Sequence, residues 1–217
     1  MEQPKIQPAI SLQAIHRLPY YLQYLKRLKQ EGLEAVSASA VAAYFGYSEI
    51  QVRKDFSAVS TCPGKPKQGF AIHTLINDIE NFLGCRNSNE AVLVGAGSLG
   101  RALLSYTGFE SYGLKIVAAF DNNKALIGTD VSGKRVFPAE RISELSRRLS
   151  IHIGIIAVPA EQAQLVCDQL VAGGVQAIWN LAPVHLAVPS QILVQNENMA
   201  VSLALLSRHL REKTAAE

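Results

Sequence analysis

Cysteine is scarce in this sequence and long apolar runs are absent, which excludes several classes of protein. The 217 residues hold three cysteines, far apart, with no CxxC pair and no histidine at ligand spacing, which predicts reduced thiols and no metal site. A membrane span needs roughly 18 apolar residues, and the run at 151–159 is interrupted by His152 and Gly154. The first ten residues, MEQPKIQPAI, lack the apolar core of a secretory signal. We therefore expect a cytoplasmic protein without a membrane or metal partner.

Charge is unevenly distributed along the chain. The whole sequence carries a net charge of +3. Residues 1–70 hold nine lysines and arginines against five acidic residues, whereas the remainder has one more acidic than basic residue. A basic N-terminal segment followed by a nearly neutral remainder is compatible with a polyanionic partner of that segment, such as nucleic acid. An ordinary solvated surface explains the charge equally well, so composition alone leaves both interpretations open.

The first 80 residues contain the pattern of a helix-turn-helix. Ser11 is the candidate N-cap of a helix that leucines at helical spacing predict over 11–31, and SASAVAAYFG predicts a second helix over 37–46. Ser48 begins a third, SEIQVRKDFSAVS, in which Ser48 and Gln51 have the spacing of a capping box. Two short helices in close succession, the second of them polar and basic, are typical of this DNA-binding motif.

Two features make the third helix a candidate for DNA recognition. Arg53 and Lys54 lie on one flank of it, where they can reach base edges or phosphates, while Val52 and Phe56 anchor the other flank. The segment TCPGKPKQGF at 61–70 is rich in glycine and proline and carries two lysines, as expected of a wing. An amphipathic surface helix without a ligand is the alternative interpretation.

From residue 90 onward, strands alternate with helices. Apolar runs that end in turns predict strands at 91–95, 114–121, 151–159 and 174–183. Helical patterns separate most of them, at 99–106, 140–149 and 160–172. Near-continuous apolar strands alternating with helices indicate a parallel sheet covered on both faces. The tail reads as a further helix, and its broad apolar face must be buried against something.

A glycine-rich turn follows the first of these strands. In VGAGSLG, Gly95, Gly97 and Gly100 join a strand to a helix, and Asp121 ends the next strand 21 residues later. This is the pattern of a dinucleotide site: the glycines permit a tight turn, close approach of the pyrophosphate and close helix packing, and the carboxylate binds the adenosine ribose. Asp121 would repel a 2′-phosphate, which favours NAD over NADP. A glycine-rich turn without a ligand is the alternative.

Nucleotide binding by itself does not make an enzyme. A dehydrogenase needs a proton donor or acceptor beside the nicotinamide, and the candidates are Tyr106, His152 and His185. Each has a structural interpretation: Tyr106 as a packing residue, His152 as a hydrogen-bonded core residue and His185 as an exposed loop residue. No segment large enough for a substrate domain follows the nucleotide half. We therefore expect no catalytic residue; a small NAD-dependent oxidoreductase, or a nucleotide- or CoA-binding subunit of a complex, is the alternative.

Taken together, six segments resemble one family across nearly the whole chain and in the family's order. RLPYYLQYLKRL, QVRKDFS, VGAGSLGRALLSYTGF, AAFD, AVPA and NLAPVHLAVP resemble the Rex redox-sensing transcriptional repressors. The resemblance implies a winged helix-turn-helix domain followed by an α/β Rossmann domain with a parallel sheet. It also implies a homodimer that exchanges its C-terminal helix, binds inverted-repeat operator DNA when NADH is scarce and releases it when NADH binds. NADH and NAD⁺ would then be regulatory ligands.

The resemblance also assigns roles and boundaries along the chain. The DNA contacts would be chiefly Arg53 and Lys54, with Ser48, Gln51, Lys65 and Lys67 on or near the backbone. The cofactor contacts would be Gly95, Ala96, Gly97, Ser98, Leu99 and Gly100 for the pyrophosphate, Asp121 for the ribose, and Val158, Pro159, Asn180, Ala182, Pro183 and Tyr106 for the nicotinamide side. The boundaries would be a winged-helix domain at 1–80 (helix-turn-helix at about 18–57, wing at about 61–70), a linker at 81–89, a Rossmann domain at 90–195 and an exchanged helix at 196–217.

This sequence departs from the family pattern in three places. Ser98 stands where many relatives have asparagine, in a loop that binds mainly through its backbone. The segment 58–60, Ala-Val-Ser, replaces the Tyr-Phe-Gly that commonly leads into the wing. Gln23 and Asn198 occupy the positions where some relatives have an arginine and an aspartate that form a redox-dependent charge pair. We therefore expect the switch, formed by Gln23, Tyr106 and Asn198, to use a neutral amide pair.

Overall fold

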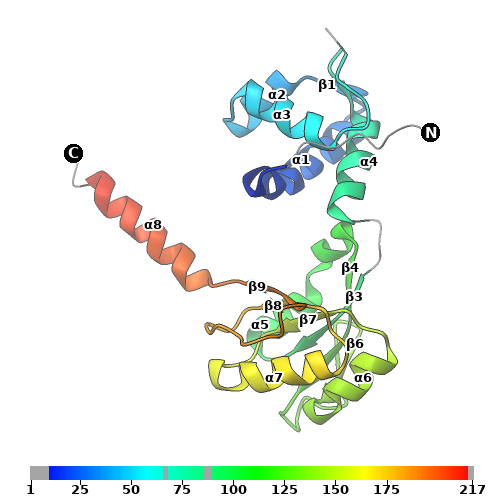
Figure 1. Ribbon diagram of the computed structural model, residues 1–217, viewed down its shortest axis with the longest axis vertical. Helices are drawn as coiled ribbons and strands as arrows, with labels where there is room; N and C mark the ends of the chain where they lie inside the picture. Colours follow the sequence, from blue (N-terminus) through cyan, green and yellow to red (C-terminus); the bar gives the residue numbers. More distant parts are fainter. Residues whose placement is uncertain (1–9, 66–67, 86–88, 215–217) are drawn as a thin grey trace. The chain divides into compact units, whose positions relative to one another are not determined.

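Two units make up the chain (Figure 1). The structure is a computed structural model that describes residues 10–65, 68–85 and 89–214. By its internal contacts, the first unit is Met1–Asn87 and the second is Ser88–Glu217. The last helix of the first unit continues to Leu83, and the first strand of the second begins at Asn89. These two residues bound the connection within the segment predicted as a linker.

The first unit consists of four helices and a two-stranded sheet. Its elements are α1 (Leu12–Gln30), β1 (Ala35–Val36), α2 (Ala38–Phe45), α3 (Glu49–Val59), β2 (Phe70–Ala71) and α4 (Ile72–Leu83). α2 and α3 are the predicted helix-turn-helix pair. β2 pairs antiparallel with β1 and closes the loop that contains the predicted wing at 61–70. Lys67 of that loop lies outside the described residues.

Serine side chains determine where the first three helices begin. The hydroxyls of Ser11, Ser37 and Ser48 each accept a hydrogen bond from the backbone N–H three residues later, at 3.2, 3.1 and 3.2 Å. Each satisfies one of the unpaired donors of a first helical turn. The N-caps predicted at Ser11 and Ser48 are confirmed. The capping box is only half present, because the side chain of Gln51 is turned toward α1 instead of back to Ser48.

An aromatic core holds α1, α2 and α3 together. Tyr21 is fully buried, and its ring packs edge-on against Phe45, Tyr47 and Phe56 at centroid distances of 5.6, 6.3 and 5.3 Å. Such ring pairs add about 0.5–1.5 kcal/mol each to the stability gained from burial. Val52 and Phe56 are buried, as predicted for the anchoring flank of α3. The opposite flank of α3 is therefore the one presented to solvent.

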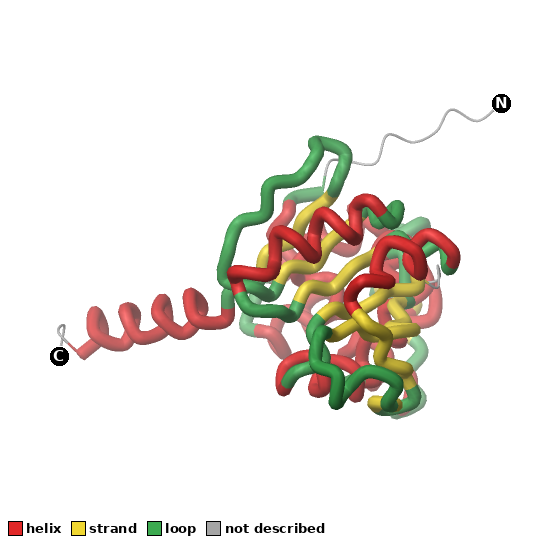
Figure 2. Tube along the Cα trace, turned by 90° about the horizontal axis from the view of Figure 1, so that it is seen from below, coloured by secondary structure: helices red, strands yellow, loops and turns green. Residues whose placement is uncertain are grey.

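The second unit is a mostly parallel sheet with helices on both faces (Figure 2). Its strands are β3 (Asn89–Val94), β4 (Leu114–Asp121), β5 (Asp130–Val131), β6 (Lys134–Pro138), β7 (Ile153–Ile156), β8 (Ala177–Asn180) and β9 (Leu193–Asn196). They lie in the order β5-β6-β4-β3-β7-β8-β9, with β5 antiparallel to β6. The six parallel strands have the strand order of the Rossmann fold, which confirms the predicted fold class.

Alternation along β3 distributes the core over the two faces of the sheet. Val92 and Val94 pack with the helices η2 (Ala139–Arg141), α6 (Ile142–Arg148) and α7 (Ala160–Ala172). Ala91 and Leu93 pack on the other face with α5 (Ser98–Ser105) and the short helix η1 (Thr107–Tyr112). All four strand residues are buried, because a central parallel strand is covered on both sides. The three helices predicted between the strands of this unit are confirmed to within two residues at each end.

Two strands of the sheet, β6 and β9, were not predicted because their sequences are largely polar. The strands β6 and β9 read KRVFP and LVQN, with too few apolar residues to resemble buried strands. The apolar run at 151–159 forms a shorter strand than predicted, β7, which begins after His152. His152 is exposed, so its interpretation as a core residue is wrong.

Helix α8 (Met199–Thr214) exposes its apolar side chains. Its leucines and valine are between 51% and 67% exposed, namely Val201, Leu203, Leu205, Leu206 and Leu210. The covering surface predicted for the tail is therefore not supplied by the described part of a single chain. No helix among the described residues is long and apolar enough to cross a membrane.

Candidate functional site

The turn after β3 has the shape that a pyrophosphate requires. Gly95 has a φ of +101°, and a side chain there would lie 2.5 Å from the carbonyl oxygen of Ala157, so only glycine fits. A side chain at Gly100 would collide with the carbonyl oxygen of Gly95. Around Gly97, in contrast, no atom lies within 4 Å of where a side chain would begin. Gly97 is also the N-cap of α5, so there is space for an anion at a helix N-terminus.

Asp121, at the end of β4, ties the glycine turn to the loop that follows the strand. One carboxylate oxygen accepts a hydrogen bond from the backbone N–H of Ala96 and the other from that of Asn123, both at 2.7 Å. Each oxygen has a further lone pair, so the carboxylate can still accept from the two hydroxyls of a ribose. Asp121 therefore both holds the turn and presents a negative charge beside it.

A crevice of about 430 Å³ lies at the carboxyl ends of β3 and β7. In the Rossmann fold the strand order reverses at this point, and ligands bind there. Five predicted contacts line it: Gly95, Gly97, Asp121, Val158 and Pro159. Seven other lining residues were not predicted, among them Asn122, Asn123, Ala139 and Gln162. The signal that these four share is position, because each directly follows a parallel strand or lies in the first turn of the next helix.

Four predicted pyrophosphate contacts lie beside the crevice without lining it. Ala96 and Gly100 are buried, whereas Ser98 and Leu99 are exposed in the first turn of α5. What they can offer a phosphate is backbone N–H groups at the helix N-terminus. Their part in nucleotide binding stays a prediction.

The turn after β8 is held by a buried amide. Asn180 is fully buried; its side-chain nitrogen donates to the carbonyl of Val184 at 2.7 Å and to Oδ1 of Asn196 at 2.8 Å. Its side-chain oxygen accepts from the backbone N–H of Ala182 at 3.1 Å. The side chain therefore positions the turn that carries Ala182 and Pro183 and is itself turned inward. These three residues are not among those that line the crevice.

Tyr106 lies at the end of α5 in a row of aromatic rings. Its side chain is 58% exposed and packs edge-on against Phe109 at a centroid distance of 4.9 Å. Phe109 packs in turn against Trp179 at 5.8 Å, next to Asn180. Tyr106 is not among the residues that line the crevice, so its predicted place near the nicotinamide stays a prediction.

The outer flank of α3 carries the cations predicted to contact DNA. Arg53 forms an ion pair with Glu49, one turn earlier on the same helix. Lys54 makes no ion pair or hydrogen bond with any described residue. Arg53 and Lys65 line one groove, of about 460 Å³, that runs from α3 and the start of α2 to the wing. The structure thus brings a recognition-helix arginine and a wing lysine together, although they are far apart in sequence.

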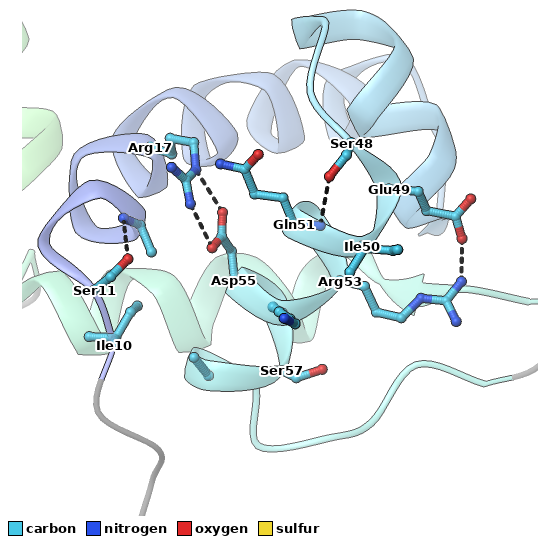
Figure 3. A pocket seen from close by; sticks show the side chains of 13 residues that line it. Ile10, Ser11, Arg17, Ser48, Glu49, Ile50, Gln51, Arg53, Asp55 and Ser57 are labelled. Atoms are coloured by element: carbon cyan, nitrogen blue, oxygen red, sulfur yellow. Dashed lines mark hydrogen bonds and ion pairs between the residues drawn. The ribbon is translucent and has the colours of Figure 1, made fainter.

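On the other side of α3 lies a larger groove, of about 1090 Å³, bounded by the first turns of α1 (Figure 3). Ser48, Gln51, Arg53 and Lys54 line it, so four of the predicted DNA contacts border one concave surface. Arg53 lines both grooves. The recognition helix is therefore a ridge with a groove on each flank.

Sequence reasoning missed the polar group that anchors this ridge. Asp55 of α3 is 5% exposed and accepts from Nε and Nη2 of Arg17 at 2.8 and 2.9 Å. The hydroxyl of Tyr21 donates to the same carboxylate at 3.0 Å. The hydrogen bond to Asp55 raises the pKa of the Arg17 guanidinium above its ordinary value. The available signal was a carboxylate on the buried flank of a helix, which requires a partner.

The predicted switch residues lie in different units. Gln23 is exposed on α1. Asn198 immediately precedes α8, and its side-chain oxygen accepts from the backbone N–H groups of Ala200 and Val201 at 3.1 and 3.2 Å. Asn198 is thus a helix N-cap, a position that aspartate and asparagine both favour. Among the described residues, no group of three or more metal-ligating side chains is placed to hold a metal ion.

A Rossmann domain with a dinucleotide crevice and a winged helix-turn-helix with a cationic outer flank occur in one chain. Together, the fold and these sites define a DNA-binding regulator that carries a nucleotide site. The family model described as "CoA binding domain" matches residues 86–184, and the one described as "Putative DNA-binding protein N-terminus" matches residues 9–57.

Relatives with a shared name cover nearly the whole chain. A Bacteroides fragilis protein named "Redox-sensing transcriptional repressor Rex" is 39% identical over 90% of this chain and 89% of its own. A structure described as "Crystal structure of RSP in complex with beta-NAD+ and operator DNA" is 31% identical, with a TM-score of 0.88 over 96% of this chain and 95% of that one. The corresponding complex with beta-NADH is 30% identical, with a TM-score of 0.83 over 96% and 97%. The chain belongs to the Rex family of redox-sensing transcriptional repressors.

Proposed function

We propose that this protein is a transcriptional repressor that binds operator DNA through α3 and the wing and releases it when NADH binds the Rossmann crevice. The observation that carries the proposal is the joint presence of a crevice bordered by Asp121 and of the cationic ridge formed by Arg53 and Lys54. Two solved structures of one relative, RSP, support it, since one holds NAD⁺ with operator DNA and the other holds NADH. The balance between NADH and NAD⁺ would then control the occupancy of the operator.

Such control requires that the two ligands favour different states of the protein. NADH must bind the state that is unable to bind DNA more tightly than the state that can, because a ligand with equal affinity for both shifts nothing. Moving the population from 99:1 to 1:99 needs a preference of about 10⁴-fold. The position of Asp121 at the adenosine end makes it common to NADH and NAD⁺, so the preference must arise at the nicotinamide end.

We propose further that the protein acts as a cytoplasmic homodimer on an inverted-repeat operator. A two-fold symmetric protein matches a two-fold symmetric site, with one recognition helix for each half. The exposed apolar residues of α8 support exchange of this helix between subunits, because they have no cover in the described part of one chain. The neutral residues Gln23 and Asn198 would serve in the switch without a charge pair.

The residues that line the crevice favour a nucleotide that is bound as a regulatory ligand over one that reacts as a cofactor. Of the three proton-transfer candidates, Tyr106, His152 and His185, all are exposed and none is among the residues that line the crevice. An oxidoreductase remains distinguishable by a direct assay of NADH oxidation with carbonyl substrates. A CoA ligand is the second candidate, favoured by the description of the family model that matches residues 86–184.

Fluorescence anisotropy of labelled DNA tests the proposal. The DNA is taken from upstream of the protein's own gene and from a random pool enriched by the protein. It is titrated with protein alone and with NADH, NAD⁺ or CoA. We expect tight binding that NADH abolishes and that NAD⁺ and CoA leave intact. Absence of DNA binding in every state at low salt would overturn the repressor proposal.

Replacing Lys54 by alanine is expected to weaken operator binding while leaving NADH binding unchanged. No described residue pairs with Lys54, so its ammonium is available to a base edge or phosphate. Loss of a base contact costs roughly 1–3 kcal/mol, which anisotropy titration at fixed salt measures. Lys115→Ala, on the second unit's β4, is the matched loss of charge. Equal affinity of Lys54→Ala and the parent for the operator would contradict the assignment.

Replacing Glu49 by glutamine is expected to strengthen binding to unrelated DNA. Glu49 pairs with Arg53 on the surface that would face DNA, so the variant releases a cation to the phosphates. Each additional phosphate neutralised steepens the dependence of log K on log salt concentration by about 0.9. Anisotropy titrations at several salt concentrations measure that slope. An unchanged slope would mean that Arg53 already leaves Glu49 in the parent complex.

A further inference from the structure

Arg17 is held rigidly, although it lies on a surface that would face DNA. Its side chain is only 14% exposed. Two of its three nitrogens donate to the buried carboxylate of Asp55, at 2.8 and 2.9 Å, and Tyr21 donates to the same carboxylate. A planar guanidinium paired through two nitrogens has its plane and direction determined by that partner. The third nitrogen, Nη1, therefore points in a fixed direction.

That direction is toward the side chain of Gln51. Figure 3 shows Gln51 reaching from α3 toward Arg17. An amide can present either its oxygen or its nitrogen, and the partner decides which orientation is satisfied. Because Arg17 has only donors, the satisfied orientation turns the oxygen toward it. The Gln51 oxygen then accepts from Nη1 at 2.8 Å and from Nη2 at 3.2 Å.

This orientation limits what Gln51 can recognise. A free glutamine pairs with adenine through its oxygen and its nitrogen together. With the oxygen occupied by Arg17, the group that remains is the NH₂, which only donates. It can pair with an acceptor, such as a phosphate oxygen, guanine N7 or O6, or thymine O4, and it cannot pair with adenine through both atoms. Gln51 lines the groove beside Lys54, where such an acceptor would lie.

We propose that Arg17 is a positioning residue for DNA binding, which holds Gln51 so that the recognition helix presents one fixed hydrogen-bond donor to an acceptor on DNA. The inference rests on the proposed operator binding and adds to it a residue of α1 that does not itself need to touch DNA. A side chain held in its binding orientation before association loses less conformational freedom when the complex forms. The buried Asp55 orients Arg17, and Arg17 in turn orients Gln51 on the surface that would face DNA.

A double-mutant cycle tests the proposal, with the full-length protein and the enriched operator. The variants are Arg17→Lys, Gln51→Ala and the two combined. If Arg17 acts through Gln51, each single change weakens operator binding about tenfold, and the combined variant is no weaker than Gln51→Ala alone. Losses that multiply, to about a hundredfold in the combined variant, would overturn the proposal. Arg27→Lys, an exposed arginine on the same helix, is the matched control and is expected to bind as the parent does.

A second variant keeps the test decisive if Arg17→Lys fails to fold. Gln51→Glu preserves the pairing with Arg17 and replaces the outward NH₂ by an acceptor oxygen. We expect this variant to lose at least tenfold in operator affinity without a fall in Tm or in NADH affinity. Operator binding equal to that of the parent would show that the donor is not used, and the proposal would be wrong.

One further comparison distinguishes a phosphate acceptor from a base acceptor. Another distinguishes failure of the proposed function from failure of this inference. If the acceptor is a phosphate, Gln51→Ala weakens binding to operator and to unrelated DNA by the same factor; if it is a base, only operator binding falls. A parent protein that binds no DNA overturns the proposed function and this inference together. A parent that binds DNA, with losses that multiply in the cycle, overturns the inference alone.

Discussion

Replacing Asp121 by alanine is expected to raise the Kd for NADH about a hundredfold and to leave DNA affinity in the absence of nucleotide unchanged. The carboxylate holds the glycine turn through the N–H of Ala96 at 2.7 Å and is the only acidic side chain that lines the described crevice. Hydrogen bonds to a charged group contribute roughly 1.5–3 kcal/mol each. Loss of the ribose contacts together with the anchor therefore gives a change of about 3 kcal/mol. Quenching of Trp179, the single tryptophan, by bound NADH measures the affinity.

Two controls separate this effect from a general loss of structure. Asp168→Ala removes an exposed aspartate of α7 that pairs with Gln164, and is expected to bind NADH as the parent does. The Asp121→Ala variant should also lose part of its preference for NADH over NADPH, because the charge that repels a 2′-phosphate is gone. If NADH affinity is retained while the Tm is unchanged, Asp121 is not the ribose ligand.

Replacing Asp55 by alanine is expected to reduce the free energy of unfolding of the first unit by about 3 kcal/mol. The change leaves the guanidinium of Arg17 and the hydroxyl of Tyr21 without their common partner. Breaking one side of a buried ion pair costs roughly 3–5 kcal/mol, and the lower end applies because Arg17 retains some exposure, 14% of its side chain. Urea denaturation followed by far-ultraviolet circular dichroism measures the change, since this unit is mainly helical.

The matched control is an exposed ion pair at the end of α1, the helix that carries Arg17. Arg27 and Glu31 lie 3.5 Å apart with side chains 50% and 53% exposed. Glu31→Ala is expected to change the free energy of unfolding by less than about 0.5 kcal/mol, because exposed pairs contribute little. Equal free energies of unfolding for the Asp55→Ala and Glu31→Ala variants would show that the buried pair contributes no more to stability than the exposed one.

Several features of the fold were predictable because they depend on neighbours in the chain. A serine hydroxyl caps the N–H three residues later, so Ser11 and Ser48 mark helix starts without reference to the rest of the protein. Gly95 and Gly100 report a backbone shape that side chains would block, and Gly97 leaves open space at the start of the helix. The continuous apolar run of β3 reports a sheet covered on both faces. These are local or periodic properties, and they were sufficient for the fold class.

Other features required partners that only the folded chain brings together. Gln51 has the spacing of a capping box, yet its amide is directed by Arg17, which the folding of α1 against α3 places beside it. Asn180 lies in a turn predicted to contact the cofactor, and its buried amide is held by Asn196 from the following strand. The strands β6 and β9 are too polar to be recognised in isolation and form because adjacent strands offer them hydrogen bonds.

The sequence by itself determined the two kinds of domain, the helix caps, the glycine turn and the acidic residue that follows it. Tertiary structure decided which polar side chains face a ligand and which serve the fold. The physical reason is that a buried polar group must find a hydrogen-bond partner, and that partner can lie anywhere in the chain. Asp55 and Arg17, 38 residues apart, were assigned to each other by packing, and that pairing sets the surface that the recognition helix offers.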